Sequence, residues 1–82
     1  MEHKLKTYPV FFADIEFGAK TFEIRKNDRN YQVGDVLRLE EYEPLTNEYS
    51  GDFLLVQVTY TICLDGIPDI PDGFIGMSIE LF

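Results

Sequence analysis

The spacing of the hydrophobic residues changes at Gly18, and this change constrains the fold of the 82-residue chain more than any other feature. Before Gly18, one segment has the 3.6-residue period of a helix face. After it, apolar and polar residues alternate, as they do in half-buried strands. The chain is therefore predicted to combine one short helix with a sheet that uses most of the other residues. The predicted strands cover residues 3–7, 21–25, 36–43, 52–63 and 74–81.

The helix is predicted in the segment YPVFFADIEFG, where the apolar spacing and the residues at both ends are typical of a helix. Its apolar face has the i, i+3, i+4, i+7 spacing and consists of Tyr8, Phe11, Phe12 and Ile15. Thr7 is the expected N-cap, Pro9 is tolerated in the first turn, and Gly18 is well placed to end the helix.

Alternation assigns each strand residue to one of two faces. In the strand after Gly18, Thr21, Glu23 and Arg25 are expected on the outer face, opposite Phe22 and Ile24. The other apolar faces are expected to comprise Leu37 and Leu39; Val56, Val58, Tyr60 and Ile62; and Ile75, Met77, Ile79 and Leu81.

These elements predict a single α+β domain over residues 1–82. Turn-rich segments separate the strands at 26–35, 44–51 and 64–73, the last with two Pro and two Gly. Seven Phe and five Tyr supply enough apolar surface for a core. We expect a small mixed β-barrel of five to six strands with one or two short helices. An open sheet is the less favoured alternative, because closure would protect its edges.

Several classes of protein are not supported by the sequence. No apolar run approaches the roughly 20 residues of a membrane span, and no signal peptide opens the chain. Cys63 is the only cysteine, so no internal disulfide is expected, and Cys63 is expected to be a small buried hydrophobic residue rather than a nucleophile. With His3 as the only histidine, neither a metal site nor a cofactor is predicted. We expect a cytoplasmic protein, whose oligomeric state the sequence leaves open.

Charge is distributed unevenly along the chain, whose net charge is −8. Residues 1–29 hold six of the seven Lys and Arg against five acids, whereas residues 30–82 hold Arg38 alone against ten. A protein that binds extended duplex DNA would need a broad basic face. This chain has cations for one pocket only, which favours a compact anionic ligand such as a nucleotide or a looped-out base.

Most of those cations lie in GAKTFEIRKNDR, residues 18–29. Glu23 can accept a hydrogen bond from the exocyclic amine of a base, and a paired Arg25 can still donate to a phosphate. Lys20 supplies a point charge, while Lys26 and Arg29 would form the rim of the same cleft. The simpler interpretation is a Glu–Arg pair on an exposed strand, followed by a solvated turn. Tyr42 and Tyr49 either stack on a base or pack with their hydroxyls in water.

Four of these residues carry a resemblance to a known family. Gly18, Lys20, Glu23 and Arg25 match the motif G-x-K-x-x-E-x-R, and the chain resembles the ASCH domains, a branch of the PUA-like superfamily. The likeness continues through VGDVLRLEEY and VTYTI, and the two ends resemble a compact bacterial and phage subfamily of unknown function. The resemblance implies a PUA-like barrel that binds RNA or a nucleotide in a cleft beside the first helix.

Three functions remain open at this stage. The first is RNA or nucleotide binding through Lys20, Thr21, Glu23 and Arg25, with Lys26 and Arg29 at the rim. The second follows from relatives that hydrolyse the amide of acetylated cytidine: Lys20 would occupy the catalytic lysine position and would activate Thr21 or a water. Glu23, the acid or base in that scheme, stands where those enzymes have their threonine. The third is an interaction module that presents the acidic residues of 30–82 to a basic protein.

Overall fold

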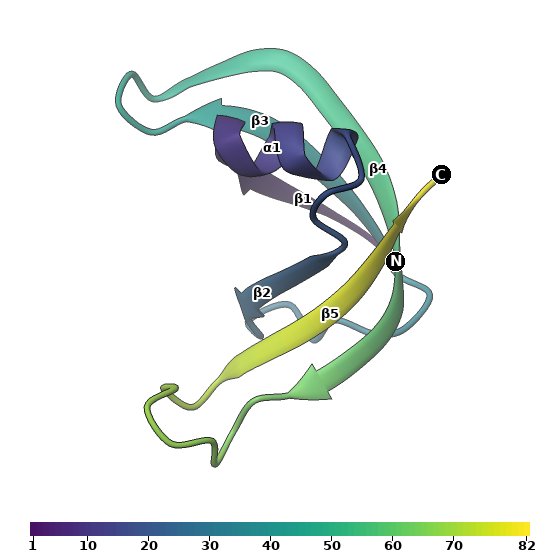
Figure 1. Cartoon of the computed structure of the whole chain (residues 1–82), viewed down its shortest axis with the longest axis vertical. Helices are drawn as coiled ribbons and strands as arrows, with labels where there is room; N and C mark the ends of the chain where they lie inside the picture. The colour runs from purple at the N-terminus through teal and green to yellow at the C-terminus, as the bar shows by residue number, and fades with distance from the viewer.

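Five strands form one mixed and strongly curled sheet with a single short helix on its concave side (Figure 1). The computed structural model describes all residues from 1 to 82. In chain order the elements are β1 (Glu2–Thr7), α1 (Pro9–Glu16), β2 (Phe22–Lys26), β3 (Val36–Glu43), β4 (Glu48–Cys63) and β5 (Phe74–Leu81). The predicted α+β class, the strand number and the barrel-like curl are confirmed. The only helix, α1, has eight residues, so no helix is long and apolar enough to cross a membrane.

The strand order is β1-β3-β4-β5-β2, which makes β1 and β2 the two edges. β1 runs parallel to β3, and the other neighbouring pairs are antiparallel. The long strand β4 pairs with β3 over Glu48–Gln57 and with β5 over Val56–Cys63. β4 therefore bends through the molecule and turns the sheet into a half-barrel, with both edges flanking its open side (Figure 1).

The core lies on the concave side of the sheet and receives residues from every strand except β2. It comprises Leu5, Ile15, Tyr31, Leu37, Leu39, Val56, Val58, Ile75, Met77 and Ile79. Leu37 and Leu39 are fully buried, as predicted, and the inward face of β5 is confirmed except at Leu81, which is partly exposed. Alternation therefore located most of the core.

The helix begins one residue later than expected and has a different cap. Tyr8, in an extended conformation, occupies the N-cap position without a side-chain capping bond, and Pro9 starts the helix. Gly18 ends it in the left-handed conformation, with φ of 81°, as predicted. Thr7, predicted as the cap, is instead the last residue of β1, because the parallel pairing with β3 continues to that position.

The prediction for β4 was wrong at Tyr60 and Ile62, which were expected to share the face of Val56 and Val58. Both side chains are exposed, and so is Cys63 at the end of the strand, which was expected to be buried. The register shifts between Val58 and Tyr60, and such a bulge reverses which residues face inward. The strand also begins at Glu48 rather than at residue 52, because the hairpin turn is confined to Pro44–Asn47.

The prediction for β2 had the correct period and the wrong face. Phe22 and Ile24 are 51% and 56% exposed, whereas Glu23 is 4% exposed. Glu23 and Arg25 therefore belong to the inner face of the strand, not to its outer face. The physical reason is that β2 lies at the open side of the half-barrel, where a buried carboxylate finds cationic partners. Burying a charge costs far less when the charge is paired and hydrogen-bonded.

A second group of polar residues is buried at the opposite end of β1. His3 Nε2 lies 2.9 Å from Asp35 Oδ2, and the backbone amide of Gln32 donates to the same oxygen over 3.0 Å. The N-terminal ammonium donates to Oδ1 over 3.2 Å. The ring of Tyr31 packs edge-on against His3, with 4.9 Å between centroids. Burial raises the pKa of the Tyr31 hydroxyl. The group fixes the start of β3 against β1.

Candidate functional site

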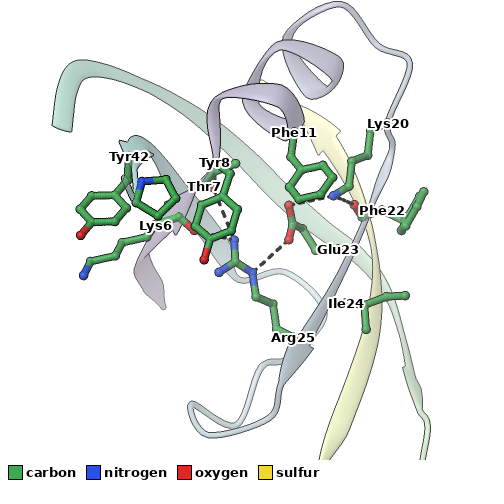
Figure 2. A pocket seen from close by; sticks show the side chains of 11 residues that line it. Lys6, Thr7, Tyr8, Phe11, Lys20, Phe22, Glu23, Ile24, Arg25 and Tyr42 are labelled. Atoms are coloured by element: carbon green, nitrogen blue, oxygen red, sulfur yellow. Dashed lines mark hydrogen bonds and ion pairs between the residues drawn. The ribbon is translucent and has the colours of Figure 1, made fainter. Parts of the chain in front are cut away.

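A cavity of about 710 Å³ opens between the start of α1 and the inner face of β2 (Figure 2). Both edge strands contribute to it, so the cavity occupies the open side of the half-barrel. Its lining residues are Lys6, Thr7, Tyr8, Phe11, Lys20, Phe22, Glu23, Ile24, Arg25, Tyr42 and Pro44. Three of the six residues predicted to bind a ligand are among them: Lys20, Glu23 and Arg25.

Glu23 is the most deeply buried charged residue of this cavity, with 6% of its side chain exposed. Lys20 Nζ donates to Oε1 over 3.1 Å, and Arg25 Nε donates to Oε2 over 3.0 Å. Figure 2 shows the carboxylate held between the two cations. Each carboxylate oxygen can accept about two hydrogen bonds, so both retain acceptor capacity for a ligand. A carboxylate fixed in this way is a preorganised hydrogen-bond acceptor.

Arg25 connects the carboxylate to the opposite edge of the sheet. Its Nη2 donates to the backbone oxygen of Lys6 over 3.0 Å and approaches Thr7 Oγ1 at 3.4 Å. Its Nη1 has no partner in the structure and remains free to donate. The side chain is 25% exposed. Arg25 therefore bridges β1 and β2, which share no strand pairing, and still offers donors to an anion.

Lys20 reaches Glu23 because of how the helix ends. Gly18 turns the chain, and the backbone amides of Ala19 and Lys20 both donate to Asp14 O. Nζ of Lys20 then donates to Phe22 O over 2.7 Å as well as to Glu23. The same ammonium lies 4.9 Å from the ring centroid of Phe22 and 5.6 Å from that of Phe11. Lys20 is thus held in place by aromatic, carbonyl and carboxylate contacts.

Aromatic rings form much of the remaining wall. Tyr8 and Phe11 stack with 6.4 Å between centroids and an interplanar angle of 18°, and both are partly exposed. Across the cavity, Lys6 Nζ lies 4.5 Å from the ring centroid of Tyr42, which packs against Tyr49. Tyr42 lines the cavity, whereas Tyr49 lines a neighbouring hollow. Exposed flat rings offer a stacking surface to a planar ligand.

The structure separates the other three predicted residues from this cavity. Lys26 and Arg29 line a second hollow of about 590 Å³, which shares Lys6 and Arg25 with the first. Thr21 precedes β2 and lines a third of about 140 Å³, beside Ile79. Lys20 lines this third hollow as well, and no hydrogen bond joins it to Thr21.

Sequence reasoning missed seven of the eleven lining residues. Thr7 was assigned to a helix cap, and Tyr8, Phe11, Phe22 and Ile24 were assigned to apolar faces. Lys6 and Pro44 were given no role in a site. A signal was present for Tyr8 and Phe11, because an eight-residue helix on a small sheet can bury only part of a four-residue apolar face. Phe12 and Ile15 take that buried part.

The cavity offers an acceptor, several donors and aromatic walls, and Glu23 is its only carboxylate. No cluster of three or more His, Cys, Asp or Glu side chains that could hold a metal ion occurs in the structure. The arrangement can accept hydrogen bonds from a polar molecule, donate others to it and contact a flat face of it.

Comparison with known proteins identifies the family. A family model described as a domain of unknown function, DUF3850, matches residues 2–79. No curated protein matches the chain significantly. Since the match covers nearly the whole chain, from β1 into β5, the fold and the cavity both fall inside it. The chain therefore belongs to the DUF3850 family, a domain family of unknown function.

Proposed function

We propose that this protein is an ASCH-type, PUA-like domain that binds a nucleotide or a short piece of RNA in the cavity between α1 and β2. The observation that carries the proposal is the buried Glu23 carboxylate, fixed by Lys20 and Arg25 in a cavity that the rings of Tyr8 and Phe11 also line. A nucleobase has a planar face for the rings and a polar edge for the charged groups.

The polarity of the site favours a base with an exocyclic amine. Glu23 accepts hydrogen bonds, and carboxylates accept from the N4 amine of cytosine. Lys20 and the free Nη1 of Arg25 are donors that suit a carbonyl or ring nitrogen on the same edge. Uracil presents a carbonyl where cytosine presents its amine, so it would set oxygen against the Glu23 carboxylate. We therefore propose that cytosine or adenine bases bind in preference to uracil.

Nucleoside titrations followed by backbone amide NMR shifts test this proposal. We expect cytidine or adenosine to shift the amides of residues 18–25 and of Tyr8 and Phe11, and uridine to bind more weakly. Glu23→Gln should weaken binding by roughly 10- to 100-fold, which corresponds to about 1–3 kcal/mol for one good base contact. The matched control is Glu80→Gln, which removes one exposed carboxylate outside the cavity.

A second variant keeps the test valid if Glu23→Gln destabilises the fold. Tyr8→Leu removes part of the stacking surface from a partly exposed position, so the fold should persist while base binding weakens. If no nucleoside or nucleotide shifts the amide signals of the cavity residues, the proposal is overturned.

A further inference from the structure

We propose that the second hollow is a phosphate subsite, so that the ligand is a nucleoside phosphate rather than a free nucleoside. This inference rests on the proposed function, because it places the base in the first cavity. The hollow has a volume of about 590 Å³ and lies along β1 and the segment that ends β2. Five of its nine lining residues are cations: Lys4, Lys6, Arg25, Lys26 and Arg29.

The cations of this subsite are largely unneutralised. Lys4, Lys6 and Lys26 are exposed and take part in no ion pair, and Arg29 Nη1 donates to the neutral backbone oxygen of Lys4 over 2.8 Å. Arg25 alone is paired with a carboxylate, Glu23. The two acids in the lining are Asp28 and Glu40, and Glu40 is already held by Arg38 at 3.2 Å. Positive charge therefore exceeds negative charge locally, in a protein whose net charge is −8.

The two cavities together collect nearly all the positive charge of the molecule. Six of the seven Lys and Arg line one or both of them, and Arg38 is the exception. Lining a concave surface with one sign of charge focuses the potential there and attracts counter-ions. The acidic remainder would repel a long phosphate backbone that passed beyond this region. The charge distribution thus selects a ligand with few phosphates.

Arg25 and Lys6 give the two cavities a common border. Arg25 holds Glu23 through Nε and β1 through Nη2, which fixes its guanidinium and leaves Nη1 unpartnered. A guanidinium in that position donates to a phosphate next to a base held by Glu23. Lys6 lies over Tyr42 on one side and lines the basic hollow on the other. The geometry therefore matches base and phosphate as adjoining parts of one ligand.

Affinities for a matched ligand series test the subsite. The series is one nucleoside, its 5′- and 3′-monophosphates, and a trinucleotide with the same central base, measured by calorimetry at two NaCl concentrations. We expect at least one monophosphate to bind about tenfold or more tightly than the nucleoside, since each charge-assisted contact contributes more than a neutral one. A further gain in affinity with the trinucleotide would identify single-stranded RNA as the source of the phosphate. If the trinucleotide binds no more tightly than the monophosphate, the source is a mononucleotide.

Variants separate the subsite from the base cavity. Lys4→Ala combined with Lys26→Ala should abolish most of the gain from the phosphate and leave nucleoside affinity unchanged. For single-stranded ligands, the slope of log affinity against log salt should become shallower by about 0.7 for each phosphate that these lysines no longer neutralise. The control, Arg38→Ala, removes the one cation outside both cavities and should leave the phosphate gain unchanged.

Two results would contradict this inference in distinguishable ways. If nucleoside and monophosphates bind equally well, with shifts at Glu23 and Phe11, the phosphate subsite is wrong and the proposed base site stands. In the second result, phosphates shift only the amide signals of residues 26–29, and no ligand shifts the amide signals around Glu23. The hollow is then a simple anion site. The assignment of a nucleoside phosphate then fails together with the proposed function.

Discussion

At the scale of single residues, two carboxylates are buried and each depends on its partners. Glu23 is held by Lys20 and Arg25, and Asp35 by His3, the Gln32 amide and the N-terminal ammonium. Removing one partner of a buried charge costs more than the pair contributes, because the other charge remains desolvated. The two carboxylates differ in location. Glu23 lines the cavity between α1 and β2, whereas Asp35 lines none of the hollows described above and bonds to groups of the protein itself.

Asp35 predicts how stability changes in acid. Burial by itself would raise the pKa of this carboxyl, but hydrogen bonds from His3, Gln32 and the N-terminus outweigh it and lower the pKa below 3.8. A carboxyl whose pKa is lower in the folded state stabilises the fold at pH values above its pKa in the unfolded state. This stabilisation is lost as the pH falls through its pKa in the folded state. Asp35→Asn should therefore lower the free energy of unfolding at pH 7 by about 1–3 kcal/mol and flatten its pH dependence below pH 4.

Urea unfolding at pH 7, 4 and 3 measures this effect. Asp52→Asn is the matched control, because Asp52 is an exposed residue next to Gly51 and has no ion pair in the structure. An unchanged acid profile in Asp35→Asn would show that other groups determine acid unfolding.

At the scale of elements, β2 is the strand whose faces the structure reverses, and this reversal is testable. Ile24 is 56% exposed on β2, whereas Ile79 is 6% exposed on β5. Ile79→Ala should cost about 2–5 kcal/mol, the usual range for a buried aliphatic side chain. Ile24→Ala should cost about 0.5 kcal/mol or less, as is usual for surface substitutions. Chemical denaturation of both variants measures the difference, and equal costs would mean that Ile24 is part of the core.

The same strand shows what the sequence could and could not predict. Alternation identified every strand, the Gly18 turn and the inward residues Leu37, Leu39 and Ile79. It gives a period but not the choice of face, and hydrophobicity chose the wrong face for β2. Only the fold brings the helix start and the end of β1 beside Glu23, so the place of Thr7 at the cavity could not be predicted. For Tyr8 and Phe11 the short helix indicated exposure, but not that they lie beside Glu23. A one-residue bulge in β4 is equally invisible to a period of two.

At the scale of the whole molecule, β4 is the strand that joins the two halves of the sheet. In one half, β3 pairs with the first part of β4, and β1 pairs with β3. In the other half, β5 pairs with the second part of β4, and β2 pairs with β5. The overlap is confined to Val56 and Gln57, where β4 pairs on both sides. Val56 is also fully buried in the core between the halves. The two halves should therefore unfold together, as small single cores usually do.

Val56→Ala tests this coupling. It should cost about 2 kcal/mol from reduced apolar burial and the cavity left behind, and the unfolding transition should remain single. Native-state hydrogen exchange should report the same loss of protection for amides of β3 and of β5, because opening either half exposes Val56. Leu55→Ala, on the more exposed face of the same strand, is the control and should change protection little. Loss of protection in β5 and β2 alone would show that the halves open independently, and the cavity around Glu23, which both edge strands line, would then open with β2.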